Sequence, residues 1–384
     1  MFLLLDFSDE ILLKIINYLD FINKVCLKHA CFVLNNLIQI TDFYNIDPKY
    51  LQKLTDDQLK FHPNITKLNA KGNLKIIDVN HLTQLKKLNA SYEYTLKGSY
   101  KCGIDQQGIS KLNLIKLYVS GNNTIKNINW MSNLKVLDAS YSGITQNGIK
   151  GLDLVKLNLS FNMKIHDISW MKNLRYLDIS KDCGLKQKGI GGLNLIKLNA
   201  YDNIEIKDVS WMTNLRELDA SWSSINQKGI NGLNLERLNI SCNHKITDLN
   251  WMTNLRELDV SFSMTGIDQN GISKLNLTKL NAVDNSKITN VNWMNKLKYL
   301  DASGKNCGID DNGISNLDLI LLDASNNTKI TNVNHMNNLK SLNSIGNDEL
   351  KNNTNLTNLK LVIIDKKDPW KKVMIDQMDI AVVI

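Results

Sequence analysis

Proline is scarce in this sequence, with 3 residues among 384, and long apolar runs are absent. Proline-rich disordered chains and collagen-like chains are therefore excluded, and 43% hydrophobic against 22% charged residues is typical of a chain that folds. No stretch approaches the roughly 20 apolar residues that a membrane-spanning helix needs. The apolar start Met1-Phe2-Leu3-Leu4-Leu5 meets Asp6 at once and lacks the basic start of a secretory signal.

These absences predict a cytoplasmic, intracellular protein with reduced thiols and no membrane partner. The Asn-, Lys- and Ile-rich composition is also typical of an AT-rich genome, such as that of a protist or a large DNA virus. A viral protein would occupy the cytoplasm of its host cell.

Groups that could support catalysis or bind a metal are few. The six cysteines form no CxxC pair and have no histidine at a zinc-ligand spacing: Cys26, Cys31, Cys102, Cys183, Cys242 and Cys307. The six histidines form no HExxH motif, and no nucleophile elbow occurs. We therefore expect no metal, no cofactor and no enzymatic activity.

The net charge is +8, from 46 Lys and Arg against 38 Asp and Glu. Basic and acidic residues are interspersed, whereas nucleic-acid-binding proteins concentrate basic residues on one face. A nucleic-acid partner is therefore not expected.

Asparagine is in excess, with 53 of 384 residues but no run longer than two, which indicates one asparagine per repeat rather than a low-complexity tract. The pattern L-x-x-L-x-(L/A/V/I) recurs mostly every 20 to 22 residues, so the chain resembles leucine-rich repeat proteins. In that family each unit supplies one short strand and one return segment. The fifteen anchors of the repeat are Ile65, Leu85, Leu114, Leu134, Leu154, Leu174, Leu195, Leu215, Leu235, Leu255, Leu277, Leu297, Leu319, Leu339 and Leu356.

Two types of unit alternate. The first carries asparagine at its ninth position, where we expect the side-chain amide to satisfy backbone groups of a turn: Asn122, Asn162, Asn203, Asn243, Asn285 and Asn327. The second carries glycine before an isoleucine, which resembles the return segment of leucine-rich repeats in F-box proteins: Gly108, Gly148, Gly189, Gly229, Gly271 and Gly313.

A tryptophan also recurs in units of the first type, at Trp130, Trp170, Trp211, Trp251 and Trp293. It could stack on a ligand or pack between neighbouring units. Packing is favoured, because large and small residues alternate along the repeat.

The side chains beside the strand leucines are expected on the concave face of the sheet. Lys or Arg there neighbours Asp on the next strand, which indicates either a self-satisfied ladder or a polar surface for a protein. Tyrosines interrupt the polar pattern, and the one long spacing inserts residues 92–100. We predict a partner site on this face and insertion, comprising Tyr94, Tyr100, Tyr118, Asp138, Tyr176, Asp178, Tyr201, Asp219, Arg237, Asp259, Tyr299 and Asp301.

Residues 1–45 do not fit the repeat. The segment from Asp9 to Asp20 resembles an F-box, with serine at position 8 instead of the familiar proline. The resemblance implies docking to a Skp-type adaptor of a cullin–RING ubiquitin ligase. It implies contact through Phe7, Asp9, Glu10, Ile11, Leu12, Ile15, Ile16 and Leu19.

The predicted fold is thus an α/β solenoid: a curved leucine-rich-repeat array with a parallel concave sheet, preceded by a small helical F-box-like module. The expected domains are the module at 1–45, an N-terminal cap at 46–64, repeats at 65–361 and a C-terminal cap at 362–384. The cap should begin a helix at Asp368-Pro369-Trp370.

Two functions are compatible with this organisation. One is the substrate-recognition subunit of a cullin–RING ubiquitin ligase, whose repeats hold an unidentified target protein. The other is a leucine-rich-repeat binding or inhibitor protein without a ubiquitin role, whose N-terminal helices only cap the solenoid.

Overall fold

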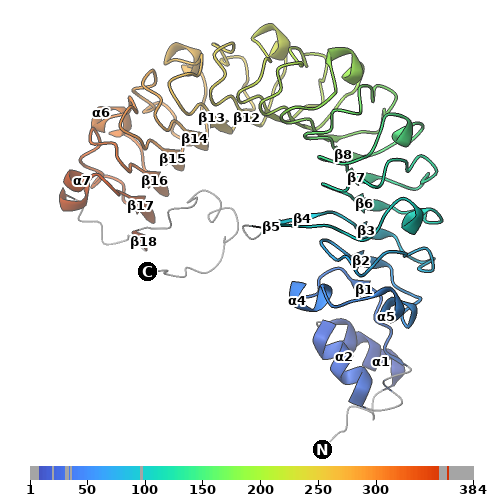
Figure 1. Ribbon diagram of the computed structural model, residues 1–384. Coiled ribbons are helices and arrows are strands. Elements are labelled where there is room, and N and C mark those ends of the chain that lie inside the picture. Colours follow the sequence, from blue (N-terminus) through green and yellow to red (C-terminus); the bar gives the residue numbers. More distant parts are fainter. Residues whose placement is uncertain are drawn as a thin grey trace, which may run out of the picture. The chain divides into compact units, whose positions relative to one another are not determined.

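Figure 1 shows the computed structural model of the chain, which describes residues 8–19, 21–30, 34, 37–95, 98–353 and 361–362. The chain divides into two compact units. Unit 1 comprises residues 1–178 and 182–193, and unit 2 comprises residues 179–181 and 194–384.

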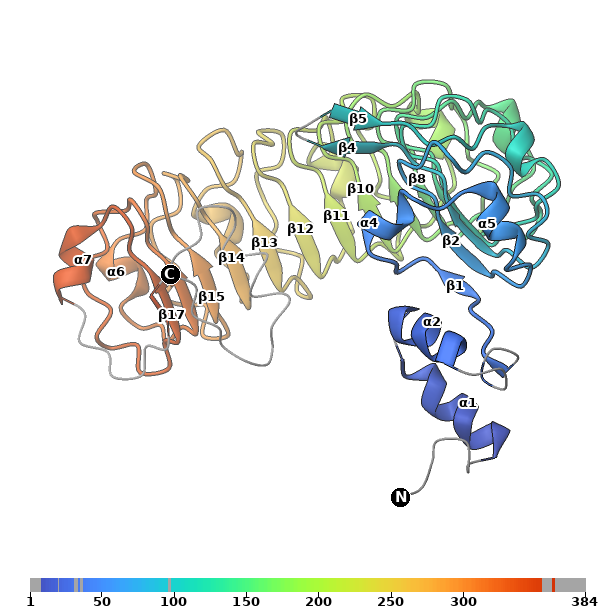
Figure 2. The same ribbon diagram turned by 60° about the horizontal axis from the view of Figure 1, so that its bottom comes forward.

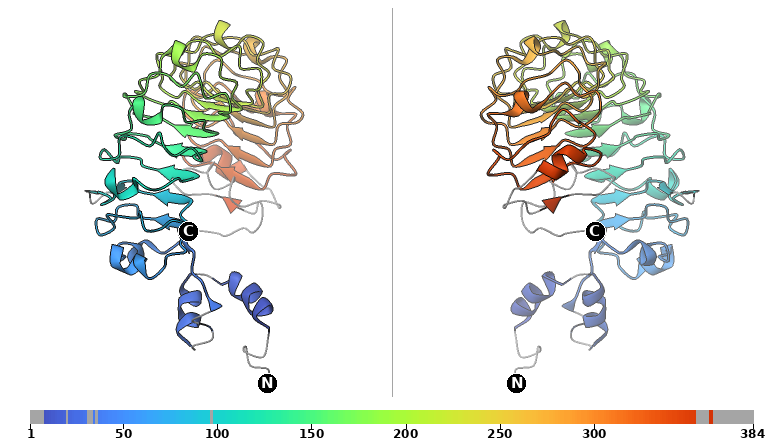
Figure 3. Two further views of the ribbon diagram at one scale, coloured as in Figure 1. Left: turned by 90° about the vertical axis from the view of Figure 1, so that its right-hand side faces the viewer. Right: turned by 90° about the vertical axis from the view of Figure 1, so that its left-hand side faces the viewer.

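Unit 1 begins with two helices, α1 (Asp9–Asn17) and α2 (Phe21–Ala30). Helix α1 starts after Ser8, whose backbone is extended but whose side chain makes no capping hydrogen bond, while Asp9 and Glu10 in the first turn complement the helix dipole. Both helices lie beyond β1 and α5, at the N-terminal end of the unit (Figures 2 and 3). Phe7, Asp20 and the segment 31–33 lie outside the described residues.

The sheet of unit 1 is parallel and in register. Its strands are β1 (Asp42–Phe43), β2 (Lys67–Asn69), β3 (Lys87–Asn89), β6 (Lys116–Tyr118), β7 (Val136–Asp138), β8 (Lys156–Asn158) and β9 (Tyr176–Asp178). Strand β1 pairs with β2 through Asp42↔Lys67, so the sheet starts inside the range 1–45 that the sequence assigns to the helical module. Its two residues do not match the leucine pattern of the repeat, so the pattern does not predict this strand.

Between these strands run α4 (Pro48–Leu51), α5 (Asp56–Lys60), the 3₁₀ turns η2 (Gln107–Ile109) and η3 (Asn147–Ile149), and an antiparallel hairpin, and a third 3₁₀ turn, η4 (Gln187–Ile190), follows β9. The hairpin is the predicted insertion, formed by β4 (Glu93–Thr95) and β5 (Gly98–Tyr100).

Unit 2 repeats the same plan, and Figure 2 shows its strands side by side. They are β10 (Lys197–Asn199), β11 (Glu217–Asp219), β12 (Arg237–Asn239), β13 (Glu257–Asp259), β14 (Lys279–Asn281), β15 (Tyr299–Asp301), β16 (Leu321–Asp323), β17 (Ser341–Asn343) and β18 (Leu361–Val362). The return segments contain η5 (Lys228–Ile230), η6 (Asn270–Ile272), α6 (Asp311–Ile314) and α7 (Asp348–Asn353).

The last predicted anchor is misplaced. Ser341 pairs with Leu361, so the position equivalent to Leu339 is residue 359 and not Leu356. Two leucines three residues apart both fit the pattern, and only the pairing separates them. The predicted C-terminal cap, including Asp368-Pro369-Trp370, lies outside the described residues after Val362.

The predicted repeat solenoid with a parallel sheet is confirmed within each unit, but the return segments are less helical than an α/β solenoid implies. In the described part most of them are 3₁₀ turns or irregular. A period of about 20 residues leaves too few residues after the strand for a regular helix.

Leucine, isoleucine and methionine fill the core. The middle residue is buried in each of the three-residue strands β2, β3 and β6 to β17, for example Leu137, Leu218 and Leu258, while its neighbours lie on the opposite side of the sheet. We call that opposite side the sheet face.

A ladder of buried asparagines connects successive repeats, as predicted for the ninth position. Asn162 donates to the carbonyls of Ala139 and Ile144, and its side-chain oxygen accepts from the backbone N–H of Lys164. The six predicted residues are each at most 2% exposed. Asn73 and Asn347, which the alignment did not include, are buried in the same arrangement.

The tryptophans pack between neighbouring repeats, the alternative that the sequence favoured. The indole N–H of Trp130 donates to the Leu112 carbonyl at 2.9 Å, and Trp170, Trp251 and Trp293 make the equivalent bond. The methionine after each of these tryptophans is fully buried. These aromatic side chains are thus part of the repeat architecture.

Candidate functional site

The sheet face carries two polar rows, one from the first and one from the third residue of each strand. In unit 2 the first row is an ion-pair ladder. The two carboxylate oxygens of Glu217 lie 2.7 Å from Lys197 Nζ and 2.7 Å from Arg237 Nη1. Arg237 Nε lies 2.9 Å from Glu257 Oε1. Burial alone would raise the pKa of Glu217, but Lys197 and Arg237 together hold it below its usual value. These charges satisfy one another, which is the self-paired arrangement considered from the sequence.

The second row alternates Asp and Asn. In β11 and β13, the Asp219 carboxylate accepts from Asn239 Nδ2 at 3.3 Å, and Asp259 accepts from Asn281 Nδ2 at 2.9 Å. Each also accepts from the backbone N–H two residues later. Burial raises the pKa of both carboxyls, and the charge of Asp259 raises that of Asp219 further.

A third feature follows the strands, at the third residue after each strand end. This position, which we call the left-handed position, has a φ between 48° and 68° in nine non-glycine residues: Tyr141, Phe161, Lys181, Asp202, Trp222, Cys242, Phe262, Asp284 and Asn326. Glycine, which adopts this conformation without strain, occupies it elsewhere, as at Gly121 and Gly304.

Four bulky aromatic residues occupy the left-handed position. Tyr141, Phe161, Trp222 and Phe262 are 56%, 46%, 49% and 45% exposed. A left-handed conformation costs about 1–2 kcal/mol for a residue with a Cβ. These rings remain about half exposed, so burial offsets little of that cost, and strained residues of this kind cluster at functional sites.

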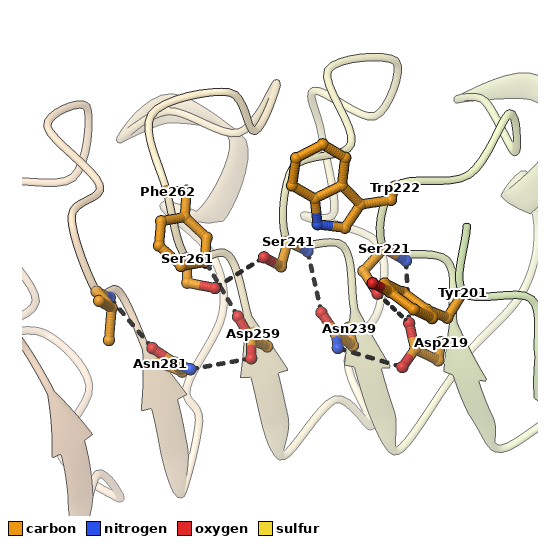
Figure 4. A pocket seen from close by; sticks show the side chains of 11 residues that line it. Tyr201, Asp219, Ser221, Trp222, Asn239, Ser241, Asp259, Ser261, Phe262 and Asn281 are labelled. Carbon is orange, nitrogen blue, oxygen red and sulfur yellow. Dashed lines mark hydrogen bonds between the residues drawn. The ribbon is translucent and has the colours of Figure 1, made fainter. Parts of the chain in front are cut away.

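Trp222 and Phe262 border a hollow of about 450 Å³ in unit 2 (Figure 4). Its floor is polar, formed by Asp219, Asn239 and Asp259 with serines beyond them. The full lining is Tyr201, Asp219, Ser221, Trp222, Asn239, Ser241, Asp259, Ser261, Phe262, Asn281 and Val283. The volume falls within the roughly 300–1,000 Å³ of ligand pockets, and this hollow is our candidate site.

Unit 1 has a different local arrangement near its first strands. The ammonium of Lys87 lies 3.3 Å from the ring centroid of Tyr44 and 5.7 Å from that of Tyr118, and the two rings are 6.4 Å apart. Burial lowers the pKa of Lys87, and Lys116 and Lys67 lower it further. Tyr118 is thus engaged in a cation–π cluster.

The structure brings together only part of the predicted partner site. Tyr201, Asp219 and Asp259 line the hollow, and Arg237 belongs to the adjoining ion-pair ladder. The others lie on other strands of the two units: Tyr118, Asp138, Tyr176 and Asp178 in unit 1, and Tyr299 and Asp301 in unit 2.

The predicted loop residues belong to the hairpin of unit 1. Tyr100 is exposed, and Glu93 approaches Lys71 at 3.8 Å. The side chain of Tyr94 lies outside the described residues.

Trp222 and Phe262 were missed by the sequence reasoning. The signal was available, because the same repeat position holds glycine, asparagine or aspartate in Gly121, Asn326 and Asp284. A bulky, half-exposed aromatic residue where several other repeats have a turn former favours a binding role.

The residues of the F-box-like motif divide between two sides of α1. Leu12 and Ile16 are buried, at 2% and 3% exposure. Ile11 and Ile15 are 45% and 38% exposed, and Tyr18 just after the helix is 93% exposed. Asp9 and Glu10 are exposed and Leu19 is partly buried. The structure therefore places Leu12 and Ile16 inside the module rather than on its surface.

The described residues also bear on metal binding, thiol chemistry and membrane insertion. Across the described residues, no three His, Cys, Asp or Glu side chains group closely enough to bind a metal. Burial raises the pKa of Cys102 to about 12 and that of Cys307 to about 11, so both thiols stay protonated near neutral pH. None of the described helices has the length and apolar character to cross a bilayer.

Comparison with known proteins gives structural similarities only. No protein-family model and no curated protein matches the sequence. An internalin (InlF) of Listeria monocytogenes is similar at 21% identity and a TM-score of 0.46, over 80% of this chain and 92% of that chain.

The functional domain of InlJ, from the same bacterium, is 20% identical with a TM-score of 0.42, over 74% of this chain and 69% of that one. The yeast complex of Rad7 and Elc1 contains a chain with 15% identity and a TM-score of 0.31, over 80% of this chain and 88% of that one. The strand register and the asparagine ladder define the solenoid independently of these similarities.

Proposed function

We propose that the chain is a protein-binding scaffold that holds a target on its sheet face and docks a Skp-type adaptor of a cullin–RING ubiquitin ligase through α1. The observation that carries the adaptor role is the exposed apolar stripe of Ile11, Ile15 and Tyr18. At about 100° per residue these three side chains lie within about 60° of one another around the helix. Clustered exposed apolar residues favour a protein partner.

The alternative that the N-terminal helices merely cap the solenoid has less support. The first repeat is already covered by residues closer to it. Asn73 donates to the carbonyls of Leu51 and Leu54, and Asp56 accepts from the backbone N–H groups of Ile77 and Asp78. Phe43 on β1 is buried, and this strand pairs with β2 of the first repeat. The outward stripe of α1 is not needed for that cover.

The decisive experiment uses variants that change the stripe without changing the interior of the module. Ile11→Asp combined with Ile15→Asp should abolish capture of a purified Skp-type adaptor by the full chain. Burying these two side chains contributes on the order of 3 kcal/mol, so affinity should fall by roughly a hundredfold. Leu12→Asp or Ile16→Asp would be uninformative, because both side chains are buried and their change would unfold the module.

Leu13→Asp is the matched control, because Leu13 is 39% exposed but lies about 200° from Ile11 around the helix. It should leave adaptor capture unchanged. If the unmodified, folded chain captures no adaptor, the ligase role is wrong and the alternative remains, a repeat protein that binds or inhibits its partner without ubiquitin transfer.

A further inference from the structure

The lining of the hollow in unit 2 carries charge of one sign only. Every ionised residue that lines it is acidic, namely Asp219 and Asp259. Two basic residues of the neighbouring row are already paired, since Arg237 contacts both Glu217 and Glu257 and Lys197 contacts Glu217. The lining of the hollow thus contains two carboxylates and no basic residue, while Lys279 acts on Asp259 and Lys181 lies over the Tyr201 ring from outside the lining.

Two acidic residues favour a cationic ligand, and the aromatic side chains that border the hollow favour a cation as well. Trp222 and Phe262 follow β11 and β13, two strands apart, and both lie along the edge of the floor where the strands end (Figure 4). Cys242 holds the equivalent position after β12. Strands in a sheet are about 4.8 Å apart, so the two aromatic residues are separated by roughly 10 Å, enough for one planar group between them. Aromatic faces attract cations, tryptophan most strongly.

We propose that this hollow binds an arginine or lysine side chain presented by a protein partner, with Trp222 and Phe262 flanking the cation and Asp219 and Asp259 beneath it. This inference rests on the proposed function, because it names the chemistry that the sheet face recognises in its target. The complementary charge favours a basic peptide segment over a neutral saccharide, which would also stack on aromatic rings.

The two carboxylates remain acceptors for such a ligand. Asp219 and Asp259 each receive hydrogen bonds from one asparagine amide and one backbone N–H, and Asp219 also receives one from the Ser221 hydroxyl. These bonds fix the orientation of the carboxylates without neutralising their charge. A guanidinium with several N–H donors can add bonds to both, whereas an ammonium meets one at a time. Arginine should therefore bind more tightly than lysine.

The test is a titration of the full chain with short peptides, followed by NMR of the Trp222 indole N–H, which Trp222→Phe identifies. Ac-Ser-Gly-Arg-Gly-Ser-NH₂ should shift this resonance in a saturable way. The peptide with glutamine in place of arginine should not. Asp219→Asn combined with Asp259→Asn should weaken arginine-peptide binding at least tenfold, and Phe262→Ala at least threefold.

Asp323→Asn is the matched control, because Asp323 makes the same bonds to Asn343 and to the backbone N–H of Ser325 but lies outside the hollow. It should leave the affinity unchanged. Thermal unfolding of each variant separates a lost site from a lost fold.

Three results would overturn the inference: equal shifts with the glutamine peptide, a shift with methyl β-glucoside but none with the arginine peptide, or no shift with any probe. Adaptor capture by the Asp219 and Asp259 variant should stay normal. A failure of the hollow is thereby distinguished from a failure of the adaptor role, which depends on α1.

Discussion

Asn243 makes clear how a single buried amide connects neighbouring repeats. Its Nδ2 donates to the carbonyls of Ala220 and Ile225 at 2.9 and 3.0 Å, and its Oδ1 accepts from the backbone N–H of Lys245 at 2.9 Å. The turn cannot make these bonds within itself. The asparagine thus supplies hydrogen bonds that the backbone of one repeat lacks.

Asn243→Ala should therefore be strongly destabilising. It leaves the Ile225 carbonyl and the Lys245 N–H without these partners in a site that is 1% exposed, and each unmet group costs about 1–3 kcal/mol, while the Ala220 carbonyl keeps the Ser223 hydroxyl as a donor. We expect a loss of about 3 kcal/mol or more in the free energy of unfolding, measured by urea denaturation. Asn254→Ala, at an exposed residue of the same repeat, should change the free energy of unfolding by less than about 0.5 kcal/mol. Similar losses in both variants would argue against the ladder.

At this scale the sequence was informative where a residue type recurs and weak where it departs from the recurrence. The ladder asparagines were predictable because one polar residue at one repeat position needs a backbone partner. Trp222 and Phe262 were not recognised, because their conformation depends on a left-handed φ that periodicity does not encode. Leu12 and Ile16 were assigned to a surface because a motif alone does not tell which side of a helix is buried.

Among the elements, the 3₁₀ turns explain the glycine of the second type of unit. A Cβ on Gly229 would lie 2.1 Å from the carbonyl oxygen of Lys207 in the preceding repeat. The Gly229 carbonyl also accepts from the backbone N–H of Val209 at 2.9 Å. The turn therefore packs directly on the neighbouring backbone, which only glycine permits.

Gly229→Ala should separate these two repeats and cost about 3 kcal/mol or more, at the upper end of overpacking effects. Gly232→Ala serves as the matched control. Gly232 has a φ of 76° but no atom within 4 Å of its ideal Cβ, so only the backbone strain of about 1 kcal/mol is expected. The difference in urea midpoint between the two variants measures the close approach. Equal midpoints would contradict it.

The elements themselves were predictable from the leucine spacing, but their ends were less so. The strands β2 to β17 of the main sheet follow the predicted anchors, because a buried leucine in each strand sets the register. Strand β1 and the register of β18 were not predictable, because the pairing of Asp42 and of Leu361 depends on the neighbouring strand rather than on a local pattern.

For the whole molecule, stability in a repeat protein is approximately a sum over units and their neighbour contacts. A deletion that preserves the alternation of unit types should then be tolerated. The sequence offers such a site, because residues 211–219 and 251–259 are identical, WMTNLRELD. Removing residues 214–253 joins Thr213 to Asn254 and recreates the same local sequence at the junction.

We expect the chain lacking 214–253 to fold, with an unchanged fraction of its residues in strands, and to unfold cooperatively. Its urea m-value should fall by about a tenth, in proportion to the surface that is lost. Removing 214–243 instead deletes 30 residues and places a turn where a strand should pair, so this chain should lose its cooperative transition. Circular dichroism during urea titration compares the two deletions. The 40-residue deletion also removes Trp222 and Asp219, so the folded product should no longer bind the arginine peptide, while its adaptor capture through α1 should persist.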